Sequence, residues 1–445
     1  MPQGIGSRPH AASPHSPARP PWAPSCAGPP SSPWPAMFAL VRRLPPALGR
    51  RGLAAPAAPP LLAQLPDFTA GAEALEAGKF TEAQLMLQRA SDVADAHFPE
   101  AAAPERALCH SALGRCLWNL GRYVEAAAQY EAGLAAARGR APALATSHLA
   151  EAAARVRFEL GHFEASASLV AEAMEESPGS DAALLISEAL GVVNCGAKPP
   201  PMAGPLAAGD EVDVIFEATR RMNLLVGRGL PDEDEEVNIS YREELASDEV
   251  WHELDEQGPL GNFLAASGEA PSLPLMALRS TGGQLAVASG QEGEPWARPL
   301  LVKALDDFEV LRPRGPTMGP VRFRTLGALG TLTARASHDA VAAEGLFRSA
   351  VDHIEEATLG ELSHSLDLGR GPLWRAMVFW AYADLVQQGR QADQRSSEIT
   401  ALRQRAAAAL GEEHSPAGPT RQQLRWALAC LPPPEWLRAE ELIGS

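Results

Sequence analysis

Cysteine and histidine, the residues that most often bind metals or act as nucleophiles, are scattered along this chain. The five cysteines are Cys26, Cys109, Cys116, Cys195 and Cys430. None belongs to a C-x2-C pair, the spacing typical of zinc and redox sites. Cys109 and Cys116 are seven residues apart on one helical face, but two thiols alone make a poor metal site, so we interpret them as small buried apolar residues. The sequence therefore predicts no metal site, no cofactor and no disulfide framework.

The eleven histidines and the glycine motifs offer no catalytic pattern either. The zinc-protease motif H-E-x-x-H is absent, since His353-Ile-Glu-Glu lacks the second histidine. Neither the phosphate-binding G-x-x-x-x-G-K-[ST] nor the nucleophile motif G-x-S-x-G occurs. We interpret the Gly-Arg-Gly runs at 227–229 and 369–371 as isolated turns. The sequence therefore predicts that the chain is not an enzyme.

Residues 113–134, LGRCLWNLGRYVEAAAQYEAGL, show instead a unit of two short amphipathic helices. Apolar and small residues recur at helical spacing before Gly121, which accepts the left-handed conformation that ends a helix. A second apolar stripe begins at Tyr123 and continues to Leu134. A helix pair this short cannot bury its apolar faces alone, so several stacked copies are expected.

This unit resembles the tetratricopeptide repeat (TPR). The residues that match the family pattern are Leu113, Gly114, Gly121, Tyr123, Glu125, Ala126 and Tyr130. The positions at which the family has Trp, Tyr and Pro hold His110, Leu117 and Arg138. The resemblance implies an all-α fold, a solenoid of helix-turn-helix repeats.

Further copies of the unit are predicted within residues 63–196. The turn glycines Gly78, Gly121 and Gly161 are 43 and 40 residues apart, more than the roughly 34 residues of a standard TPR. The resemblance is therefore to a variant with long repeats. A fourth first helix is expected at residues 181–194.

The resemblance also implies which side chains face a partner, because the first helices of TPR repeats line a concave surface. With Gly114 at position eight of its repeat, the partner-facing residues are Arg115, Trp118, Asn119, His148, Glu151 and Arg155. Arg115 and Arg155 hold equivalent positions, where they could bind an acidic segment or a C-terminal carboxylate of a protein partner. The alternative is that these arginines pair with acidic residues of neighbouring helices.

The N-terminal region has the composition of a leader. Residues 1–36 are rich in Pro, Ser and Ala and are expected to be disordered. Residues 37–62 begin with Met37, contain four arginines and no acidic residue, and resemble an organelle transit peptide. We favour a mitochondrion over a plastid because hydroxyl residues are scarce after Met37, which we take as the physiological start. The alternative is a disordered basic tail.

The rest of the chain divides into three regions. Residues 197–320 are interpreted as an irregular acidic insert, 321–431 as a second, degenerate TPR-like segment, and 432–445 as a tail. Helices are predicted at 211–226, 241–254, 295–311, 374–388, 398–410 and 420–431, and short strands near 275–278 and 284–288. Ala343-x3-Phe347 resembles the second helix of a repeat. The five acids of 232–236 are expected in a solvated loop or, alternatively, in a site for a basic peptide or cation.

The net charge and the composition of the chain limit the classes of function that are expected of it. The net charge is −17, and an acidic surface repels phosphate backbones, so nucleic acid is not an expected ligand. No run of eighteen apolar residues occurs, so no membrane span is expected. We predict a non-enzymatic TPR scaffold or adaptor that binds protein partners in a mitochondrion and takes part in assembling a larger complex. The alternatives are a permanent accessory subunit of such a complex and an RNA-binding helical repeat, which the charge disfavours.

Overall fold

The computed structural model describes most of the chain between residues 61 and 431. The described residues are 61–195, 206, 211–230, 252–254, 258–266, 271–290, 295–312, 319–337, 339–359, 366–411 and 418–431. The predictions for the leader (1–36 and most of 37–62), the acidic block 232–236 and the tail 432–445 lie outside these residues, as does most of the helix predicted at 241–254.

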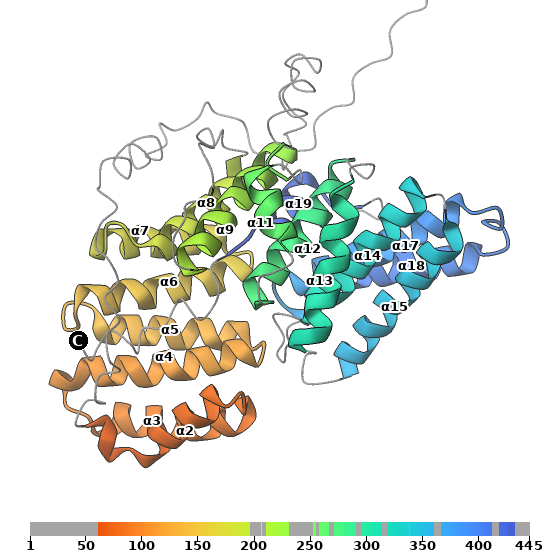
Figure 1. Cartoon of the computed structure of the whole chain (residues 1–445). Coiled ribbons are helices and arrows are strands. Elements are labelled where there is room, and N and C mark those ends of the chain that lie inside the picture. Colours follow the sequence, from red (N-terminus) through yellow and green to blue (C-terminus); the bar gives the residue numbers. More distant parts are fainter. Residues whose placement is uncertain are drawn as a thin grey trace, which may run out of the picture. The chain divides into compact units, whose positions relative to one another are not determined.

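Within the described residues the fold is all-α, as predicted, with 16 α-helices and no strand (Figure 1). Their bounds are α2 (Pro66–Glu76), α3 (Phe80–His97), α4 (Ala103–Asn119), α5 (Tyr123–Ala137), α6 (Ala143–Glu159), α7 (Phe163–Glu176), α8 (Asp181–Cys195), α9 (Glu211–Gly229), α11 (Pro259–Ala265), α12 (Leu273–Ala288), α13 (Ala297–Leu311), α14 (Gly319–Ala336), α15 (Ala340–Leu359), α17 (Gly371–Gln388), α18 (Ser396–Leu410) and α19 (Arg421–Leu428). Two 3-10 helices, η1 (Leu62–Gln64) and η2 (Glu100–Ala102), precede α2 and α4.

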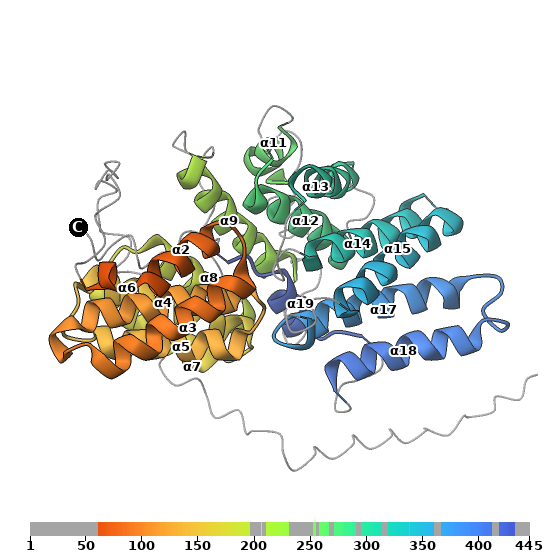
Figure 2. The same ribbon diagram turned by 90° about the horizontal axis from the view of Figure 1, so that it is seen from below.

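Consecutive helices pack as antiparallel pairs (Figures 1 and 2). The pairs are α2–α3, α4–α5, α6–α7, α8–α9, α12–α13, α14–α15 and α17–α18. The second helix of each pair also packs against the first helix of the next pair named here, for example α3 against α4 and α9 against α12. This arrangement is that of a helical-repeat array, in which each unit is stabilised by its neighbours.

The turns inside the first three pairs are the same structure repeated. Gly78, Gly121 and Gly161 have φ values of +71°, +74° and +75°, a region that glycine enters without a steric penalty. In each turn the glycine N–H donates to the carbonyl three residues earlier, and the following N–H donates to the carbonyl five residues earlier. This is the Schellman arrangement, so the helix ends predicted at these glycines are confirmed.

The packing inside the pairs also repeats, because a glycine on the first helix lies against a large residue of the second. A Cβ on Gly114 would come within 3.1 Å of the Tyr130 ring, and one on Gly330 within 2.9 Å of the Phe347 ring. Phe347 lies on α15 at the position predicted to match the second helix of a repeat. Gly283 of α12 lies in the same way against Leu301 of α13. The close approach of two helices over a glycine thus recurs in both halves of the chain.

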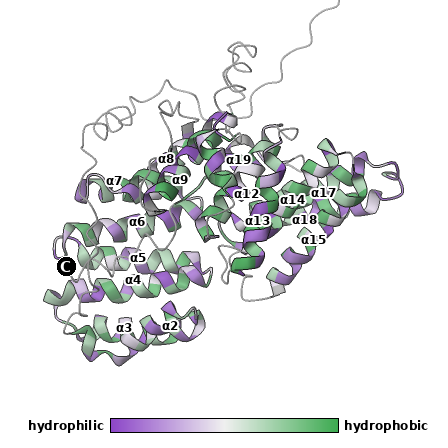
Figure 3. Cartoon of the chain, in the orientation of Figure 1, coloured by the Kyte–Doolittle hydropathy of each residue, from purple (hydrophilic) through white to green (hydrophobic). Residues whose placement is uncertain are grey.

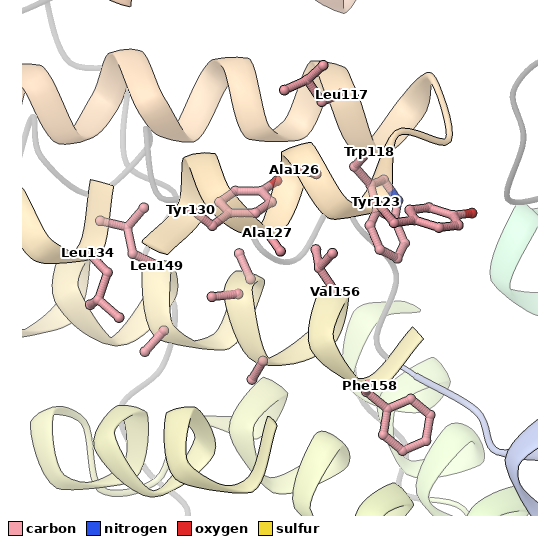
Figure 4. Close-up of a cluster of buried hydrophobic side chains, with 14 of the residues drawn as sticks. Leu117, Trp118, Tyr123, Ala126, Ala127, Tyr130, Leu134, Leu149, Val156 and Phe158 are labelled. Atoms are coloured by element: carbon pink, nitrogen blue, oxygen red, sulfur yellow. The ribbon is translucent and has the colours of Figure 1, made fainter. Parts of the chain in front are cut away.

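Most helices carry both hydrophilic and hydrophobic residues (Figure 3). In the N-terminal pairs the buried cluster combines alanines with a few large side chains, among them Leu117, Tyr130 and Phe158 (Figure 4). Among the described residues, no helix combines the length and the apolar character needed to cross a membrane.

Two sequence predictions are wrong. The short strands expected near 275–278 and 284–288 lie within the single helix α12. Pro274 is tolerated there because it is in the first helical turn, and the Gly282-Gly283 pair allows α13 to pack closely. The Gly-Arg-Gly run at 227–229 lies in α9 and is not an isolated turn, whereas the run at 369–371 does form a turn before α17.

A glycine-to-alanine pair tests the close approach of α12 and α13. In the Gly283→Ala variant the new Cβ would overlap the Leu301 side chain, so we expect a destabilisation of ~1–3 kcal/mol. Gly345→Ala on α15 is the matched control, because nothing lies within 4 Å of its Cβ. Helix propensity there favours alanine by up to ~1 kcal/mol. Urea unfolding, followed by circular dichroism, measures the stability of both variants. Equal unfolding midpoints of the two variants would contradict the packing described.

Candidate functional site

Two of the six predicted partner-facing residues lie near the end of α4 and are partly buried. The Arg115 guanidinium donates to Glu76 of α2 across 2.8 Å, and the Asn119 amide donates to the Arg115 carbonyl across 2.9 Å. The ion pair between Arg115 and a neighbouring helix is the alternative that the sequence left open. Arg115 and Asn119 keep some exposed surface.

Trp118 and Arg155 are brought together from α4 and α6, and both are buried. The Arg155 guanidinium lies over the Trp118 ring, 4.9 Å from its centroid, in cation-π geometry. The Trp118 ring in turn lies 4.8 Å from the ring of Tyr123 (Figure 4). These two predicted residues therefore contact the protein's own side chains.

Glu151 is fully buried on α6, whereas His148 is partly exposed. The Glu151 carboxylate lies 3.1 Å from the His148 ring and accepts hydrogen bonds from Ser147 and Ser180. Ser180 immediately precedes α8, so Glu151 links α6 to the start of that helix. Of the six predicted residues, Arg115, Asn119 and His148 thus remain accessible to a partner.

The structure also reveals a site that the sequence did not suggest, formed around the C-terminal segment, residues 420–431. This segment contains α19, which is capped at Thr420 by reciprocal hydrogen bonds with Gln423. Helix α19 packs against α8, α9, α12 and α17, and Leu428 is 1% exposed. Residues 420–431 therefore fill a cleft between helices α8, α9, α12 and α17.

Side chains of the cleft bind main-chain carbonyls of this segment. Two side chains of the segment also bind the surroundings, since Arg425 donates to the Leu230 carbonyl (2.8 Å) and Trp426 to the Phe158 carbonyl (3.1 Å). The Arg370 guanidinium donates to the carbonyls of Trp426 (3.1 Å) and Ala429 (2.7 Å). The carbonyl of Ala427 accepts from the Trp374 indole (3.1 Å) and from Arg324 (3.2 Å). Arg324 lies on α14 and Trp374 on α17, and Arg370 immediately precedes α17.

Asn223 of α9 completes the contacts with the main chain. Its amide nitrogen donates to the Cys430 carbonyl (2.8 Å), and its amide oxygen accepts the Cys430 N–H (2.7 Å). An asparagine amide can satisfy a donor and an acceptor of one residue at once, the pairing found between β-strands. Ala429 directly follows α19 and has a φ of −58° and a ψ of 128°. The cleft thus binds the last carbonyls of α19 and the main chain of the two residues that follow the helix.

A buried ion pair fixes one wall of the cleft. Arg370, just before α17, donates to Glu159 at the end of α6 through two nitrogens, one of them at 2.7 Å, and both side chains are 7% exposed. Gly369 has a φ of +60°, and a Cβ there would overlap the Glu159 carbonyl. The Gly-Arg-Gly run at 369–371 is therefore a sequence signal for this contact, since only glycine fits beside Arg370.

No family model, curated protein or solved structure matches this chain. The likeness to a helical repeat therefore rests on the paired antiparallel helices and their repeated turns.

A cavity of about 110 Å³ lies beside the C-terminal segment. Its polar lining side chains are Tyr123, Arg155, Glu159, Thr219, Thr281, Arg324, Arg370, Trp374 and Cys430. Burial raises the pKa of the Tyr123 phenol, and it raises the pKa of the Cys430 thiol to about 11. Both groups are therefore neutral near pH 7, which leaves the guanidinium groups and Glu159 as the charges of this wall.

The other two thiols that the structure describes are structural. Cys109 and Cys116 are fully buried, which confirms their interpretation as packing residues. Burial raises the pKa of each to about 12, and the Cys116 thiol donates to the Phe80 carbonyl. In the part of the chain that the structure describes, no group of three or more His, Cys, Asp or Glu could hold a metal ion.

Proposed function

We propose that this chain is a non-enzymatic scaffold of the TPR-like kind that binds a protein partner in mitochondria and takes part in assembling a larger complex. In this proposal the partner supplies a segment of the same kind as residues 420–431, a short helix and the residues after it, and the cleft holds the carbonyls at its helix end.

The observation that carries the proposal is the contact between the cleft and residues 426–430. Asn223, Arg370, Arg324 and Trp374 direct their donors at main-chain atoms of the last turn of α19 and of the residues that follow it. Side chains that bind the free carbonyls at a helix C-terminus stabilise that helix end. The side chains of Arg425, Trp426 and Leu428 contribute further hydrogen bonds and burial to the contact. In the free chain the C-terminal segment occupies this cleft, and a partner segment would compete with it.

Accessible polar residues on the first helices of two pairs support the proposal that the partner supplies an acidic or C-terminal segment. Arg115, Asn119 and His148 lie on α4 and α6 and keep some exposed surface. An acidic or C-terminal segment of the partner would exchange with Glu76 as the ion-pair partner of Arg115. The mitochondrial location is proposed from the composition of residues 37–62 alone.

Competition in a pull-down tests the proposal. The full-length chain, tagged and isolated from mitochondria, should retain a defined set of proteins, and an excess of a synthetic peptide of residues 420–431 should release them. Arg115→Ala with His148→Ala should reduce capture about tenfold, the effect of losing one charge-assisted hydrogen bond. Arg138→Ala, which removes an exposed arginine paired with Glu172, is the matched control and should leave capture unchanged.

Two outcomes would contradict the scaffold role. If the double variant and the control capture the partners equally well, the exposed face of α4 and α6 is excluded as a binding surface for the partner. Partners that resist an excess of the peptide, together with a purified chain that is insoluble alone, would indicate a permanent subunit of a complex.

A further inference from the structure

The cavity beside the C-terminal segment is rich in positive charge. Its lining includes three guanidinium groups, those of Arg155, Arg324 and Arg370, and one carboxylate, that of Glu159. Arg370 and Glu159 bind each other through two hydrogen bonds. The chain as a whole has a net charge of −17, so this concentration of cations is a local feature.

Arg324 is a guanidinium whose hydrogen-bonding capacity is only partly used. Among the described residues its one hydrogen bond runs from Nη1 to the Ala427 carbonyl, and its buried Nε has no partner. The group is stacked on the Trp374 ring, 4.2 Å from the centroid, which fixes its plane. A buried guanidinium with unused donors is costly, because the water it has lost is not replaced.

The charges around Arg324 also favour an anion beside this guanidinium. Burial, and next the positive charge of Arg370, lower the pKa of Arg324 to about 9. Arg324 is still charged near neutral pH. Its charge is therefore held close to a like charge, and an anion between the two groups would relieve that repulsion.

We propose that this cavity binds a small oxyanion, with a carboxylate or phosphate group, through the Arg324 guanidinium. About 110 Å³ is enough for several water molecules, each of which needs roughly 10–15 Å³, and hence for one small oxyanion. The fork of a guanidinium matches the oxygens of both anion classes. The hydroxyl groups of Tyr123 and Thr281 also line the cavity and can donate to a bound anion.

The position of the anion has a consequence for the C-terminal segment. Arg324 and Arg370, which line the cavity, also hold the carbonyls of Ala427 and Ala429. A bound oxyanion would fix both guanidinium groups and thereby stabilise the docked segment. This proposal does not depend on the scaffold role, because it concerns the isolated chain.

Calorimetric titration of the full-length chain with inorganic phosphate, and separately with succinate, tests the proposal at constant ionic strength. We expect saturable binding of at least one of the two, with chloride as the silent reference, and the tighter ligand identifies the anion class. Arg324→Gln should weaken that binding tenfold or more. Arg322→Gln, on the same helix and paired with Glu309 outside the cavity, has the same charge change and should bind as the wild type does.

Arg324→Lys provides a second variant that keeps a cation. It should bind the anion more weakly than the wild type, because it lacks the guanidinium fork. Circular dichroism checks that every variant is helical. An absence of saturable binding by the wild-type chain, or equal affinities of the Arg324→Gln and Arg322→Gln variants, would overturn the proposal.

Discussion

Replacing Arg370 by alanine is expected to destabilise the folded chain by about 3–5 kcal/mol. The substitution leaves the Glu159 carboxylate buried without its cation, and it removes the donors to the carbonyls of Trp426 and Ala429. Arg138→Ala is the matched control, because Arg138 also binds a glutamate through two hydrogen bonds (2.6 and 2.7 Å) but is 55% exposed. An exposed pair of this kind contributes about 0–1 kcal/mol.

Urea unfolding of the two variants measures the difference. The variant that combines Arg370→Ala with Glu159→Ala should be more stable than Arg370→Ala alone, because it no longer buries an unpaired carboxylate. Similar stabilities of the Arg370→Ala and Arg138→Ala variants would mean that the buried pair does not form in solution.

Local signals were sufficient to predict the first three helix pairs. Gly78, Gly121 and Gly161 end helices by a backbone conformation that neighbouring residues do not easily adopt, so the turns are readable from the sequence. Helix α12 was missed because Gly282-Gly283 suggests a loop when considered locally. Its actual role, close packing against α13, depends on residues further along the chain.

For the partner-facing residues, the resemblance to TPR repeats predicts which face of a helix they occupy. It does not predict which other parts of the chain cover that face. Arg155 lies on the predicted face, yet it lines a cavity whose other wall includes residues 427–431.

The cleft itself could not be predicted from spacing. Asn223 binds Cys430, 207 positions away, and Arg370 binds Glu159, 211 positions away. Contacts of this range leave no periodic pattern in a single sequence. The glycine beside Arg370 was the one local indication.

The second large effect concerns the C-terminal segment, which we expect to remain bound after the chain is cut. The cut is made at a protease site inserted between Gly411, which follows α18, and Gly418, which precedes the cap of α19. The segment should stay in place because Leu428 and Ala429 are buried. Cleft side chains also bind the carbonyls of Trp426, Ala427, Ala429 and Cys430. Burying a leucine side chain alone stabilises the docked state by about 1.5–3 kcal/mol.

Asn223→Ala should weaken this retention tenfold or more, since the N–H and carbonyl of Cys430 would lose their partner and each unsatisfied buried group costs about 1–3 kcal/mol. Asn194→Ala on α8, where the asparagine is exposed, is the control and should have no effect.

The most direct test of the cleft as a peptide-binding site is exchange on the cut protein. A fluorescent peptide of residues 420–431 is titrated into it, and size exclusion and anisotropy follow the bound fragment and the peptide. We expect the fragment to co-elute with the cut chain, the peptide to replace it saturably, and Asn223→Ala to weaken the exchange. Release of the fragment on cutting, from a chain that stays helical and does not bind the peptide, would contradict it.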